Sequence, residues 1–98
     1  MNKSQNIHQG HRDRLKEKLM GHTDVLADHE LLEVLLFGLI PRVDTNPIAH
    51  RLINRFGSLS KVLDSSVNAL MTVEGVGKNT AVHISTIGEV LKRINAQE

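Results

Sequence analysis

The chain contains no cysteine, which excludes a disulfide framework, a thiol nucleophile and a zinc-thiolate site. It has no tryptophan or tyrosine and only two phenylalanines. It therefore lacks the aromatic rings on which proteins stack the bases of single-stranded nucleic acids. The formal net charge is only +1, so no overall positive field attracts DNA from a distance. Any affinity for nucleic acid has to come from a local patch.

Long hydrophobic runs are also missing. The longest, Val34–Phe37, is far shorter than the roughly 20 apolar residues that a membrane helix needs. The first ten residues are polar and lack the apolar core of a signal peptide. We therefore expect a cytoplasmic protein without a membrane partner. We also expect a flexible segment over residues 1–10, followed by one domain over residues 11–98, because 98 residues suit a single domain.

What the sequence does contain is helical periodicity, and no window shows a sustained alternation of period two. Asp28, Ser58 and Ser65 are candidate N-caps, and Gly21 and Gly57 are candidate stops. The predicted fold is all-α, a compact bundle of five or six helices. The predicted helices cover about residues 11–20, 28–37, 46–56, 58–63, 65–71 and 79–94.

Two of these helices should supply much of the core. The helix after Asp28 is apolar nearly all round, which is typical of a buried central element. The last helix has one apolar face, made of Ala81, Ile84, Ile87, Leu91 and Ile94. Gly88 in the same helix predicts the close approach of a neighbour, because a glycine inside a helix otherwise costs about 1 kcal/mol.

The most informative stretch begins at Gly75, with the sequence Gly-Val-Gly-Lys-Asn-Thr-Ala. Glycines suit a tight turn, and the amides at the start of the following helix lack helical partners and can bind an anion. The spacing resembles the helix-hairpin-helix motif of DNA-binding proteins, which we place at about residues 66–94. The predicted phosphate-binding residues are Gly75, Val76, Gly77, Lys78, Asn79 and Thr80. Val76 should point inward, and the hairpin carbonyls offer a site for a monovalent cation.

Other basic residues form a candidate second patch for the DNA backbone, with a solvated charged face as the alternative. Its members are Arg12, Arg14, Arg51, Arg55, Lys92 and Arg93. Glu74 lies on the hairpin itself and would repel a phosphate. A hairpin that serves only to pack against protein therefore stays open as a second interpretation.

No catalytic or metal-binding set is predicted. His8 and His11 have a spacing that could share a metal on a helix, but no third ligand follows at a fixed distance, so we interpret them as solvated. His83 lies one turn beyond Asn79, where it could reach a phosphate.

The order of these signals resembles the N-terminal domain of the RadC family of bacterial proteins. The stretches that carry the resemblance lie within residues 11–94: His11–Leu15, Leu26–Leu32, Phe56–Leu59 and the hairpin. It implies a helical domain that precedes a JAB/MPN-type metallopeptidase-like domain, in a family labelled as DNA repair proteins. The ligand set of that second domain is absent from this sequence, so we expect an isolated, non-catalytic domain. The missing domain is a candidate partner.

A looser resemblance is to the helical domain of endonuclease-III-type DNA glycosylases. Members with lyase activity carry a nucleophilic lysine on the helix after the hairpin, where this chain has Asn79. They also need a downstream aspartate, and none follows Asp64. Glycosylase activity is therefore not expected. The first hypothesis is sequence-independent binding of the DNA backbone, and the alternative is a protein-interaction or regulatory module.

Overall fold

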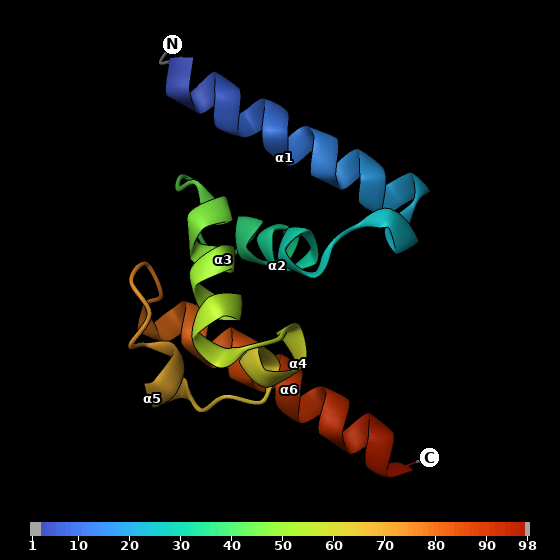
Figure 1. Cartoon of the computed structure of the whole chain (residues 1–98), viewed down its shortest axis with the longest axis vertical. Helices are drawn as coiled ribbons and strands as arrows, with labels where there is room; N and C mark the ends of the chain where they lie inside the picture. Colours follow the sequence, from blue (N-terminus) through green and yellow to red (C-terminus); the bar gives the residue numbers. More distant parts are fainter. Residues whose placement is uncertain (1–2, 98) are drawn as a thin grey trace. The chain divides into compact units, whose positions relative to one another are not determined.

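The computed structural model describes residues 3–97, with side chains described from residue 9 onward. That part of the chain contains six α-helices, one short 3-10 helix and no strand (Figure 1). The predicted all-α fold is therefore confirmed. The helices are α1 (Lys3–Gly21), the 3-10 helix η1 (Thr23–Val25), α2 (Asp28–Phe37), α3 (Thr45–Phe56), α4 (Leu59–Leu63), α5 (Val67–Leu70) and α6 (Lys78–Gln97). Among the described residues, no helix combines the length and the apolar character needed to cross a membrane.

The chain divides into two compact units, Met1–Ala49 and His50–Glu98. The sequence predicted one domain over residues 11–98, and the division falls inside α3, between Ala49 and His50. The first unit therefore holds α1, η1, α2 and the start of α3. The second unit holds the rest of α3, the short helix α4, and the hairpin with its flanking helices α5 and α6.

In the first unit, α1 packs against η1 and α2. The core cluster contains Leu15, Leu26 and Phe37, with Leu19, Leu31 and Val34 partly buried against it. The helix α1 begins at Lys3 rather than near His11. The sequence contains no proline before Gly10 to stop it, and a single glycine costs a helix only about 1 kcal/mol. Residues 1 and 2 of the segment predicted to be flexible lie outside the described residues.

The start of α2 differs by one residue from the prediction. Ala27 is the N-cap and Asp28 is the first helical residue. Glu30 reaches back, and its Oε1 accepts a hydrogen bond of 3.0 Å from the Ala27 amide. This hydrogen bond, more than the nearby Lys18, lowers the pKa of Glu30, while burial opposes the shift. Glu30 therefore does the capping that the sequence assigned to Asp28.

In the second unit, the short helices α4 and α5 both pack on α6 (Figure 1). Ser58 caps α4 as predicted, because its Oγ accepts a hydrogen bond of 3.1 Å from the Lys61 amide. The cap of α5 is Ser66, whose Oγ accepts from the Ala69 amide at 3.1 Å. The predicted cap, Ser65, instead donates to the Lys61 carbonyl at 2.7 Å.

The helix α6 is buried along only half of its predicted inner face. Ala81 and Ile84 are fully buried, whereas Leu91 and Ile94 are 43% and 47% exposed. The prediction that all five apolar positions face the core was therefore wrong for its last two turns. Gly88 is buried, and a Cβ atom placed on it would lie 1.8 Å from the backbone oxygen of Leu63. The predicted close approach at Gly88 is thus confirmed, and the neighbour is the end of α4.

Candidate nucleic-acid interface

The hairpin runs from the end of α5 at Leu70 to the start of α6 at Lys78. Gly75 has a φ of +94°, in the left-handed region that favours glycine. The Val73 amide donates to the Leu70 carbonyl at 3.1 Å, and the Val76 amide donates to the Val73 carbonyl at 3.0 Å. These successive turns reverse the chain, and the arrangement is that of a helix-hairpin-helix.

Burial separates the hairpin residues into an inner and an outer set. Val73 and Val76 are 7% and 6% exposed, so Val76 points inward as predicted. Gly75, Gly77, Lys78 and Asn79 are exposed. Thr80 is only 5% exposed, so its side chain is not the surface donor that the sequence predicted. Only its backbone amide remains as a candidate phosphate ligand.

The start of α6 presents backbone donors. The Gly77 carbonyl accepts the first helical hydrogen bond, from the Ala81 amide at 3.0 Å. The amides of Lys78, Asn79 and Thr80 therefore occupy the first turn, where N–H groups have no partner within the helix. The helix dipole adds a partial positive charge at the same end. His83 is turned to its own helix, since its Nδ1 lies 2.8 Å from the Asn79 carbonyl oxygen.

One member of the predicted basic patch lies at the hairpin. Arg51, on α3, donates from Nη1 to the Glu74 carbonyl at 3.3 Å. The bond is to the backbone, immediately before Gly75, and Arg51 itself is exposed. The hairpin surface therefore carries the Arg51 guanidinium and the Lys78 ammonium, with Glu74 as an opposing charge.

Two other members of the patch are paired with carboxylates elsewhere in the second unit. Lys92 Nζ lies 2.8 Å from an Asp64 carboxylate oxygen, and Arg93 Nε lies 3.0 Å from a Glu89 oxygen. The hydrogen bond from Lys92 to Asp64, together with the charge of Asp64, raises the pKa of Lys92. Arg55 is exposed.

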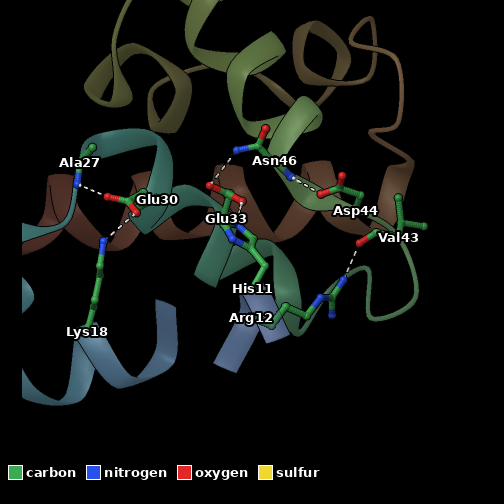
Figure 2. A network of polar contacts seen from close by, with 9 residues as sticks. All are labelled: His11, Arg12, Lys18, Ala27, Glu30, Glu33, Val43, Asp44 and Asn46. Carbon is green, nitrogen blue, oxygen red and sulfur yellow. Dashed lines mark hydrogen bonds and ion pairs between the residues drawn. The ribbon is translucent and has the colours of Figure 1, made fainter. Parts of the chain in front are cut away.

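Arg12 is only 8% exposed, so it is not part of a surface patch. Its Nη2 donates to the Ile40 carbonyl at 3.1 Å. It also donates to the Val43 carbonyl (Figure 2). Its guanidinium carbon lies 4.8 Å from the centre of the Phe37 ring. The prediction of Arg12 as a DNA contact is corrected, because its charge is used inside the first unit. Arg14 is exposed.

Sequence reasoning missed a buried carboxylate. Glu33 is 0% exposed; its Oε1 lies 2.9 Å from His11 Nε2, and its Oε2 accepts from Asn46 Nδ2 at 3.2 Å (Figure 2). The expectation that His11 is solvated was therefore wrong, and the side chain of His8 lies outside the described residues. The sequence did contain a signal of this buried site, because Glu33 is an acidic residue inside the most apolar helix. Among the described residues, no three His, Cys, Asp or Glu side chains could hold a metal ion together.

Comparison with known proteins identifies the family to which this all-α domain belongs. The family profile described as UPF0758 N-terminal matches residues 8–82. UPF0758 protein FN0909 of Fusobacterium nucleatum is 43% identical over 88 residues, which cover 89% of this chain. The chain belongs to the UPF0758 family, the RadC-like family that the sequence resembles. It spans 38% of the length of that relative. No solved structure matches the chain.

Proposed function

We propose that the chain binds the phosphate backbone of DNA without sequence preference, through the hairpin and the first turn of α6. The observation that carries the proposal is the convergence of donors on one surface. The Gly75 turn exposes the amides at the start of α6, and Arg51 is held on the same hairpin through the Glu74 carbonyl. Backbone amides and cations are the groups that bind phosphate, and they carry no sequence information.

The chemistry of the surface sets the strength of binding. One hairpin that contacts about two phosphates should show a salt slope of about −2 in a plot of log affinity against log salt. Affinity should therefore fall about tenfold between about 50 and about 200 mM salt. Glu74 opposes binding, so we expect weak affinity that is measurable at low salt.

Replacement of Lys78 by glutamate should reduce DNA affinity by about tenfold or more at low salt, because a cation beside the phosphate becomes an anion. Fluorescence anisotropy with duplex and junction DNA, at the two salt concentrations, measures the change. Lys16→Glu is a matched control, because it makes the same charge change at an exposed residue of α1. Equal, salt-insensitive affinities for the wild type and Lys78→Glu would contradict the proposal.

A protein-interaction module is the second candidate, and the uncovered end of α6 favours it. Val90, Leu91 and Ile94 are 50%, 43% and 47% exposed. With Ile84 and Ile87, Leu91 and Ile94 follow the three-and-four spacing of a helix–helix seam. An open groove of about 220 Å³, lined in part by Leu63, Gly88 and Leu91, lies beside this stripe. A helix from a second copy, or from the further polypeptide of longer relatives, could cover it.

The double substitution Leu91→Glu and Ile94→Glu should abolish such an interaction, because each change places a charge in an apolar contact. Sedimentation velocity over a range of concentrations measures self-association. We expect a concentration-dependent increase in sedimentation coefficient for the wild type and none for the variant. Gln97→Glu, at an exposed position of the same helix outside the stripe, controls for added negative charge. A monomeric wild type at every concentration would remove self-association as the role of this stripe.

A further inference from the structure

Over residues 9–21, where its side chains are described, the helix α1 is attached to the rest of the first unit mainly by polar contacts. The apolar contribution of these residues consists of Leu15, which is 2% exposed, and the partly buried Leu19. The rest of its described length, residues 9–21, is largely exposed and rich in charge. Because the stability gained from burial scales with the apolar area removed from water, these two leucines stabilise the packing of α1 only modestly.

Among the described side chains of α1, three make polar contacts with α2 and the loop after it, and Figure 2 shows these three together. His11 Nε2 lies 2.9 Å from Glu33 Oε1, in the middle of α2. Arg12 donates to two carbonyls of the loop after α2. Lys18 Nζ lies 3.4 Å from Glu30 Oε2 at the other end of α2, as an exposed pair. When the helix opens, these polar groups can hydrogen-bond to water instead, whereas apolar surface uncovered by the same opening stays unfavourable in water.

Glu33 is an unexpected residue for a permanently closed contact. Its neighbours Leu32 and Leu36 are buried with it, and a buried carboxylate is commonly less stabilising than an apolar side chain of similar volume. A carboxylate is favourable, however, on a surface that is alternately covered and wet. Asn46, on α3, also binds Glu33, so the carboxylate would keep one partner if α1 moved away.

We propose that α1 is a releasable strap, which opens from α2 as a unit while α2 and the start of α3 stay folded. Release uncovers the carboxylate of Glu33 together with the apolar surface of Leu26 and Phe37. The strap belongs to the first unit, so the proposal does not depend on DNA binding by the hairpin.

Native-state hydrogen exchange on the full chain tests the strap. We expect the amides of residues 11–21 to exchange about 100-fold faster than those of Ile84 and its neighbours in α6, since local opening needs less free energy than global unfolding. The amides along residues 11–21 should share one opening free energy. A steady gradient from the N-terminus would indicate simple fraying, and protection equal to that of α6 would indicate no strap; either result overturns the proposal.

Substitutions at the His11–Glu33 contact test whether this contact keeps α1 closed on α2. His11→Ala and Glu33→Gln should each speed exchange in α1 about 10-fold or more, because each weakens a hydrogen bond to a charged group. Exchange in α6, which follows global unfolding, should speed up by no more than the same factor, because the contact is also lost in the unfolded chain. Lys16→Ala, at an exposed position of the same helix, is the control and should alter neither. If His11→Ala leaves exchange in α1 unchanged, or speeds exchange in α6 more than in α1, the proposal fails.

Discussion

Replacing Gly88 with alanine should lower the melting temperature by about 10–20 °C, the largest effect we expect from a single methyl group in this chain. On an exposed helix the same change would stabilise by about 1 kcal/mol. Here the added Cβ would lie 1.8 Å from the Leu63 oxygen and 2.8 Å from its carbonyl carbon. Both atoms are backbone at the end of α4, so α4 and α6 must move apart.

The expected net destabilisation is about 2–3 kcal/mol, which is the usual cost of overpacking. Thermal unfolding followed by circular dichroism measures it. Gly38→Ala is the matched control, because a Cβ there meets nothing within 4 Å and the residue has an ordinary helical φ of −76°. It should change stability by less than about 0.5 kcal/mol. A Gly88→Ala protein as stable as the wild type would show that α4 does not rest on α6.

Replacing Arg12 with alanine should destabilise the chain by about 2–3 kcal/mol and leave DNA affinity unchanged. The substitution removes charged hydrogen bonds to the Ile40 and Val43 carbonyls, each worth about 1.5–3 kcal/mol before water replaces the donor. It also removes the cation above the Phe37 ring, worth about 0.5–2 kcal/mol. Rehydration of the loop carbonyls brings the total below the sum of these contributions.

Urea unfolding measures the change in stability, and anisotropy at a temperature where the variant is folded measures DNA affinity. Arg14→Ala, which removes the same charge from an exposed site of α1, should change stability by less than about 0.5 kcal/mol. The stability of Arg12→Lys should lie between that of Arg12→Ala and that of the wild type, because the lysine ammonium lacks the planar set of donors of a guanidinium. An Arg12→Ala variant with wild-type stability would contradict the structural role of this residue.

The burial pattern explains which predictions about helix faces succeeded. In α2 the sequence is apolar on all sides, so a buried helix follows from composition whatever surrounds it. In α6 the apolar spacing continues to Ile94, but α4 and α5 cover only the first part of the helix. Periodicity shows where an apolar face lies, and it contains no information about how far the neighbouring elements extend.

The sequence by itself determined the all-α class, the hairpin with its glycine turn, the inward position of Val76 and the close approach at Gly88. Each of these follows from local stereochemistry: the period of a helix, the left-handed φ open to glycine, and the missing Cβ of a helical glycine. Membership of the RadC-like family also follows from motifs along the chain.

Only the tertiary structure decided which charges are available to a partner. It buried Arg12 against carbonyls, joined His11 to Glu33, paired Lys92 with Asp64, and brought Arg51 to the hairpin. These partners, including Asp64 and Lys92, lie 22 to 31 residues apart in the sequence. A charged side chain has the same local sequence signal whether it faces water or a buried acceptor. Its role is therefore set by long-range packing, which the order of residues does not display.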